Sequence, residues 1–128
     1  MKIPSNNRLG TLWSKAVKVK YKRCPLSGTT DDLQAHHIIA KGRQRRFSLR
    51  WDVRNGVPLS AAAHRAIHDG DLVANKKLLA YVAERGDEDY LQGLKNLLKP
   101  DFLKGKGLTE DEYRVKVAEE LQEIIQGE

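Results

Sequence analysis

Two segments in the middle of the chain, LQAHHIIA at residues 33–40 and WDVRNGVPLSAAAHRAIH at residues 51–68, carry the pattern that decides the fold. The first predicts a short strand at about residues 33–39. The second turns through WDVRN into another short strand at residues 56–59, and these two strands are expected to pair as an antiparallel ribbon. Ser60 can cap a helix that runs to the Asp69-Gly70 stop, so the pattern predicts two strands followed by a helix.

The segments before this unit are less regular. Residues 8–20 can form a short helix with an apolar stripe, but Val17, Val19 and Tyr21 also alternate with lysines as in a strand, and both interpretations remain open. Between the two predicted strands, residues 41–50 carry many charges and little periodicity. We therefore expect a basic loop there, with Trp51 as an anchor in the core.

The second half of the chain predicts helices. One runs from a cap at Asp71 to about Arg85, with Leu72, Leu78, Leu79 and Val82 on its buried face. Another covers residues 88–99 before Pro100, and a loop with two glycines follows. The last helix begins at a capping box of Thr109 and Glu112. The expected fold class is therefore α+β, a short antiparallel β-hairpin plus helix embedded in a mainly helical single domain, residues 1–128.

Charge is unevenly distributed along the chain. Residues 1–54 hold 13 basic and 3 acidic residues, whereas residues 55–128 hold 10 and 14. A basic front of this kind favours a polyanionic partner, most commonly nucleic acid. Cys24 is the only cysteine, and the longest apolar run, residues 78–83, is too short for a membrane span. We expect a soluble, cytoplasmic protein without a membrane role.

All four histidines lie in or beside the predicted strand–strand–helix unit. His64 and His68 are four residues apart, so on a helix both imidazoles share one face and suit two nitrogen ligands of one metal ion. His36 and His37 are adjacent on a strand and point to opposite faces, so that one can hold a metal while the other faces substrate. Taken alone, the helical pair is more often a surface feature, and His36 to Ile39 can be a buried edge with one satisfied histidine.

The pattern AHHI at 35–38, WDVRNGVPLS at 51–60 and HRAIH at 64–68 resembles the HNH nuclease motif of the ββα-metal, or His-Me finger, superfamily. It is similar to small phage and mobile-element HNH proteins and, in its doubled histidine and H-x-x-x-H ending, to the colicin DNases. The resemblance covers about residues 24–70 and implies a ββα-metal core there. The helical extension, residues 71–128, has no counterpart in the resemblance and is expected to pack on this core.

The resemblance also implies roles for individual residues. His37 would be the general base that takes a proton from the attacking water, and His36, His64 and His68 would hold one divalent ion, Mg²⁺, Mn²⁺, Ni²⁺ or Zn²⁺. Asn55 would fix the loop and the orientation of the base through hydrogen bonds. An Asn-Gly pair is also an ordinary turn signal, and both interpretations can hold together.

Many HNH proteins carry paired C-x-x-C knuckles that bind a structural zinc. The corresponding positions hold Cys24, Ser27, Ser60 and Ala63. One thiol and an alanine cannot build a tetrahedral zinc site, so we expect no structural zinc and a small buried hydrophobe at Cys24. The missing cysteines also raise the alternative of a decayed, inactive relative.

Basic residues lie between the expected base and the expected metal-binding helix, where a phosphodiester backbone would pass. Those expected to bind nucleic acid are Lys41, Arg43, Arg45, Arg46, Arg50 and Arg54. Such contacts are independent of base sequence and weaken with salt. Without the neighbouring histidines, the same run would be an ordinary solvated surface.

The leading hypothesis is a metal-dependent HNH DNA endonuclease that hydrolyses phosphodiester bonds, by nicking or double-strand cleavage, in a phage or bacterial host cell. Its partner would be double-stranded DNA. The alternative is a catalytically silent nucleic-acid-binding module in which the imidazoles hold a structural metal. A third possibility is that the helical half binds a protein partner that targets the nuclease, but packing in the core already explains its amphipathic helices. A homodimer could make two nicks, but the sequence gives no sign of a self-complementary surface.

Overall fold

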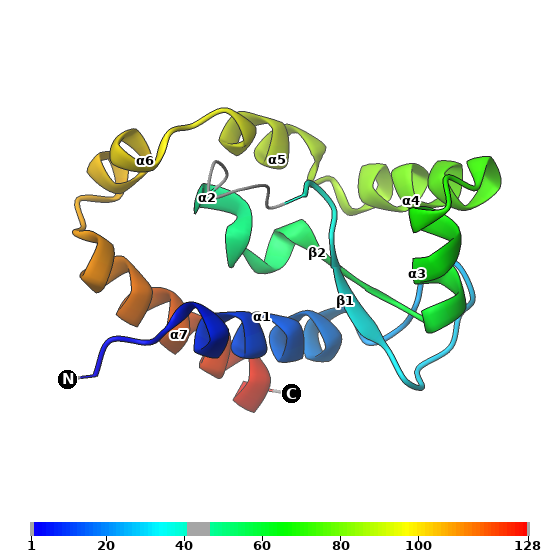
Figure 1. Cartoon of the computed structure of the whole chain (residues 1–128), viewed down its shortest axis with the longest axis horizontal. Coiled ribbons are helices and arrows are strands. Elements are labelled where there is room, and N and C mark those ends of the chain that lie inside the picture. The colour runs from blue at the N-terminus through cyan, green and yellow to red at the C-terminus, as the bar shows by residue number, and fades with distance from the viewer. Residues whose placement is uncertain (1, 41–46, 128) are drawn as a thin grey trace.

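The computed structural model describes residues 2–40 and 47–127 (Figure 1). Its helices and strands follow one another along the chain as α1 (Asn6–Tyr21), β1 (Gln34–His37), α2 (Phe47–Arg50), a 3₁₀ turn (Val53–Asn55), β2 (Gly56–Leu59), α3 (Ala61–His68), α4 (Leu72–Arg85), α5 (Glu88–Lys95), α6 (Lys99–Lys106) and α7 (Glu110–Gly127). The fold is α+β and mainly helical, as expected. None of the described helices is long and apolar enough to cross a membrane.

The two predicted strands form the expected antiparallel hairpin. Gln34 pairs with Leu59 and His37 with Gly56, so the doubled histidine lies at the end of β1 that faces the start of β2. Ser60 then caps α3, because its side-chain oxygen accepts a hydrogen bond from the Ala63 N–H. The strand–strand–helix unit is therefore confirmed.

The N-terminal segment is a helix throughout and not a strand from Val17 onward. Ser5 caps α1 by accepting from the Arg8 N–H at 3.1 Å. The buried side chains of α1 are those on its apolar stripe: Leu9, Leu12, Trp13, Ala16 and Val17. This stripe packs against both strands and against α7, which runs beside α1 in Figure 1. Burial of this stripe favours the helix over the strand, two structures that the local sequence alone did not distinguish.

The prediction of a basic loop at residues 41–50 is wrong for residues 47–50. Residues 47–50 form the short helix α2, in which Phe47, Ser48 and Leu49 are buried. Phe47 lies edge-on to Trp51 and also contacts Phe102 and Tyr113, from α6 and α7. These distant aromatic partners, and not local periodicity, place the segment in the core. Trp51 is 2% exposed, so its role as an anchor is confirmed.

Two further expectations for the second half need correction. Pro100 does not simply end a helix: it lies in the first turn of α6, where its missing N–H is harmless, and α6 replaces part of the expected loop. Leu72 and Leu79 were expected on the buried face of α4 but are 77% and 67% exposed. The buried residues of α4 are Ala74, Leu78 and Val82. The capping box of α7 forms as expected, with hydrogen bonds in both directions between Thr109 and Glu112.

The hairpin lies between two apolar clusters. One cluster joins α1, α2 and Trp51 with α6 and α7. The other contains Val57 and Leu59 of β2 and side chains from α3, α4 and α5. Because the two clusters lie on opposite sides of the hairpin, successive residues of β1 face different helices.

Candidate metal centre and histidine cleft

Three imidazoles meet beside the hairpin. His36 comes from β1, and His64 and His68 come from successive turns of α3. One ring nitrogen of each lies within 4.8 Å of one from each of the other two, and the ring centroids of His64 and His68 are 4.8 Å apart. The structure therefore brings together all three residues that the resemblance assigned to a metal ion.

A glutamine next to this cluster was missed by the sequence analysis. The Oε1 atom of Gln34 lies 2.5 Å from Nδ1 of His64. Because a carboxamide oxygen can only accept, Nδ1 carries the proton and Nε2 carries the lone pair that a metal needs. Gln34 lies two residues before His36, so strand alternation puts both on one face of β1 and could have identified it.

The protonation of the cluster suits a cation. Burial, followed by the neighbouring His64 and His68, lowers the pKa of His36 to about 4. Burial and then His68 also lower the pKa of His64. Neutral imidazoles are the metal-binding form.

The spacing of the nitrogens can be compared with that of a bound ion. Bonds of 2.0–2.1 Å from a tetrahedral ion set nitrogen atoms about 3.4 Å apart. The nitrogens of the cluster need only a small approach to reach this spacing, and the exposed His68 ring has room to turn. These residues therefore fit a divalent ion that keeps open positions for other ligands.

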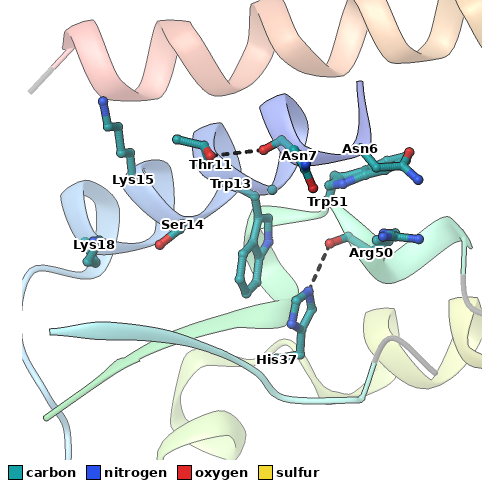
Figure 2. A pocket seen from close by; sticks show the side chains of 11 residues that line it. Asn6, Asn7, Thr11, Trp13, Ser14, Lys15, Lys18, His37, Arg50 and Trp51 are labelled. Carbon is teal, nitrogen blue, oxygen red and sulfur yellow. Dashed lines mark hydrogen bonds between the residues drawn. The ribbon is translucent and has the colours of Figure 1, made fainter. Parts of the chain in front are cut away.

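His37 points to the other side of β1. Its ring stacks on Trp13 of α1, with centroids 3.9 Å apart and planes 9° from parallel. Its Nε2 lies 3.0 Å from the Arg50 carbonyl oxygen, as Figure 2 shows. A carbonyl oxygen can only accept, so Nε2 carries the proton of the neutral ring and the lone pair is on Nδ1. The ring is half-buried and is held in one orientation by an indole and a backbone carbonyl.

Asn55 is fully buried and joins the two ends of the hairpin loop. Its side chain accepts from the Ile39 N–H at 2.8 Å and donates to the carbonyl oxygens of Ile39 and Leu49. Its own carbonyl accepts from the Ile38 N–H. Asn55 thus fixes the chain immediately after His37 and the residue before Arg50, whose carbonyl binds the His37 ring.

Of the basic residues expected to bind nucleic acid, the structure describes Arg50 and Arg54. Lys41, Arg43, Arg45 and Arg46 lie outside the described residues. Arg54 pairs with Asp87 at 2.9 Å and lies over the Tyr90 ring at 3.6 Å, with 40% of its side chain exposed. Asp87 also binds Arg85, which donates to the backbone carbonyls of Arg54 and Gly56. This network holds the start of β2 in place and was not foreseen.

The four positions that correspond to the zinc knuckles lie together. The Ser60 hydroxyl oxygen lies 3.8 Å from the Cys24 sulfur and 3.3 Å from the Ser27 hydroxyl oxygen. Ser60 in turn accepts from the Ala63 N–H at 3.2 Å. Cys24 is fully buried. A hydrogen-bonded cluster therefore joins the turn before β1 to the start of α3.

A cleft of about 490 Å³ opens beside His37, between α1 and the end of β1 (Figure 2). Its lining includes His37, Arg50 and Trp51, and the other lining residues come from α1 and are mostly polar. A histidine held by a carbonyl at the edge of an open cleft can exchange a proton with a bound molecule.

Comparison with known proteins adds one finding. The model of a family described as HNH endonuclease matches residues 24–74. The matched segment contains the hairpin, α3 and all four histidines but leaves out α1, α5, α6 and α7. No curated protein and no solved structure matches the chain.

Proposed function

We propose that this chain, in which residues 24–74 match the HNH endonuclease family, is a metal-dependent endonuclease that hydrolyses phosphodiester bonds of DNA. One observation carries the proposal: three imidazoles converge on one side of β1, while a fourth faces an open cleft on the other side. The net charge of +6 suits a polyanionic substrate.

His37 acts as the general base. Its Nε2–H stays on the Arg50 carbonyl, and its Nδ1 takes the proton from the attacking water. The Trp13 stack and the carbonyl restrict the ring, so little orientation is lost when the substrate arrives. General-base catalysis of this kind contributes roughly 10²- to 10⁴-fold to the rate.

His36, His64 and His68 bind the divalent ion, and Gln34 keeps His64 in the tautomer that binds it. When bound, such an ion supplies Lewis-acid stabilisation of the charge that develops on the phosphate and the leaving oxygen. Asn55 is a positioning residue, because its hydrogen bonds fix the backbone on either side of the base.

The opposite directions of His36 and His37 favour in-line hydrolysis. In that reaction the attacking water and the leaving oxygen lie on opposite sides of the phosphorus. A base on one side of β1 and an ion-binding cluster on the other can serve these two oxygens separately. The scissile phosphate would therefore lie at the end of β1, near the His37–Gly56 pair.

Cleavage of supercoiled plasmid DNA with Mg²⁺, Mn²⁺, Ni²⁺ or Zn²⁺ tests the proposal. We expect at least one ion to support cleavage, and His37→Ala to lose about 10²-fold or more in rate while still binding the ion. His36→Ala should instead lose ion binding, which calorimetric titration measures. Equal cleavage by wild type and His37→Ala would refute the role of His37. Tight ion binding, unfolding on chelation and no cleavage with any ion would identify a silent binding module instead.

A further inference from the structure

The cleft beside His37 is built largely by α1, which lies outside the segment that matches the HNH family. Its α1 side chains are short and polar near the start of the helix, where they include Asn7, Thr11 and Ser14. Farther along they are basic, at Lys15 and Lys18. In Figure 2 these side chains lie along α1, and His37 lies below Trp13.

The charge of this helix is one-sided. Residues 6–21 contain four basic residues and no acidic residue, and none of the described residues that line the cleft carries a carboxylate. Arg50 adds a third cation to the lining. A cleft with several cations, hydrogen-bonding amides and hydroxyls, and no acid suits a phosphodiester chain better than a peptide or an apolar ligand.

Gly10 also indicates that the surface of α1 in the cleft is accessible to a ligand. Glycine is among the least favourable residues inside a helix, and a side chain at this position would meet no atom within 4 Å. Packing therefore does not require a glycine. Because Gly10 lines the cleft, its missing side chain leaves the space clear for a bound molecule.

We propose that this cleft binds the backbone of the nucleic-acid strand that passes His37, with Lys15 and Lys18 each neutralising one phosphate. The inference rests on the proposed function, since His37 places the scissile phosphate. The cleft residues from Asn6 to Lys18 span about 18 Å along the helix, which corresponds to roughly five nucleotides of one strand in a duplex. Helix α1 thus supplies phosphate contacts from outside the matched segment.

Salt-dependent binding measures these contacts directly. In EDTA, where no cleavage occurs, fluorescence anisotropy of a labelled DNA duplex gives the slope of log affinity against log salt concentration. Each lost phosphate contact reduces this slope by about 0.9. Lys15→Gln/Lys18→Gln should therefore lower the slope by about 2 and weaken binding by roughly tenfold or more near 0.1 M salt.

A matched control removes the same charge elsewhere. Lys76 and Lys77 are exposed on α4, away from the cleft, so Lys76→Gln/Lys77→Gln should keep the wild-type slope. An unchanged slope in the Lys15/Lys18 variant, or an equal loss in the control, would overturn the inference. Wild-type protein that binds no duplex would also overturn it.

A steric pair of variants tests the same cleft without changing charge. Gly93→Tyr places a ring on α5, outside the cleft, where an added side chain meets no atom within 4 Å, and it should bind DNA as the wild type does. Gly10→Tyr projects a ring into the cleft and should weaken binding roughly tenfold or more, with an unchanged circular dichroism spectrum. Equal affinities of these two variants would contradict a strand in the cleft.

A cleavage assay distinguishes a failure of the cleft assignment from a failure of the proposed nuclease function. If Lys15→Gln/Lys18→Gln keeps the wild-type salt slope while His36→Ala abolishes cleavage, the cleft assignment fails and the nuclease function stands. If the slope falls as expected but no divalent ion supports cleavage, the cleft assignment stands and the nuclease function fails.

Discussion

Gly56 is the position where α1 approaches the hairpin most closely, and its replacement by alanine gives a sharp test of the packing. A Cβ atom at residue 56 would lie 2.2 Å from Cγ2 of Val17 and 3.1 Å from Cζ2 of Trp13. Ordinary carbon–carbon contacts are about 3.5–4.0 Å, so α1 and β2 would have to separate by more than 1 Å. The backbone of Gly56 is extended, with φ −118°, and accepts alanine without strain, which leaves steric overlap as the cause.

The cost follows from this overlap. Val17 is fully buried in a helix, where its side chain has one strongly preferred rotamer and cannot turn aside easily. We expect Gly56→Ala to lower the free energy of unfolding by about 3 kcal/mol, the upper end for overpacking. Val17→Ala alone should cost about 2 kcal/mol through lost burial and a cavity. In the double variant the new methyl group occupies that cavity, so the total should be about 2 kcal/mol, not 5.

Urea unfolding of the wild type, both single variants and the double variant measures the coupling between the two positions. A coupling of about 3 kcal/mol is expected. Additive costs, or a loss below about 0.5 kcal/mol for Gly56→Ala, would refute the close approach of α1 to β2. Because Gly56 pairs with His37 and Trp13 stacks on that ring, Gly56→Ala should also slow cleavage.

Two other substitutions test single interactions. Gln34→Ala should weaken Zn²⁺ or Ni²⁺ binding by about 10- to 100-fold in calorimetric titration, because His64 loses the partner that sets its tautomer, whereas Gln34→Glu should restore it; unchanged affinity would contradict this role. Hydrogen bonds from Lys99 first, and then from Arg114, lower the pKa of Glu110. The charged Glu110 side chain therefore stabilises the folded state at pH values above the ordinary carboxyl pKa. This stabilisation is lost as the pH falls through the lowered pKa. Glu110→Gln should therefore cost up to about 1 kcal/mol in urea unfolding at pH 7 and nothing in strong acid, and a cost that persists in acid would contradict the ion pairs.

The grouping of the histidines was predictable because it depends on local geometry. The i, i+4 spacing of His64 and His68 holds on any helix, and the alternation of His36 and His37 holds on any strand. Only the contact between β1 and α3 needed the fold, and because β2 pairs with β1 and leads directly into α3, there are few ways to make it. The convergence of His36, His64 and His68 was therefore predictable from the sequence.

Other features were not predictable because their causes lie far away in the sequence. Phe47 is buried by aromatic rings from α6 and α7, more than fifty residues later. Leu72 and Leu79 have helical spacing with Leu78 and Val82, but periodicity does not say how wide a stripe the hairpin covers. The cleft likewise depends on how α1 crosses the hairpin, which no local pattern records.

The hydrogen-bonded cluster of Cys24, Ser27 and Ser60 has a consequence for how the protein can be handled and loaded. The two turns that this cluster joins are held by a thiol and two hydroxyls, so their closure does not require a cation. If the imidazole cluster holds the proposed ion, a chelator should remove that ion while these two turns stay joined. Under the proposed function, loading would then be reversible, and adding a salt of the right metal to folded apoprotein should restore cleavage.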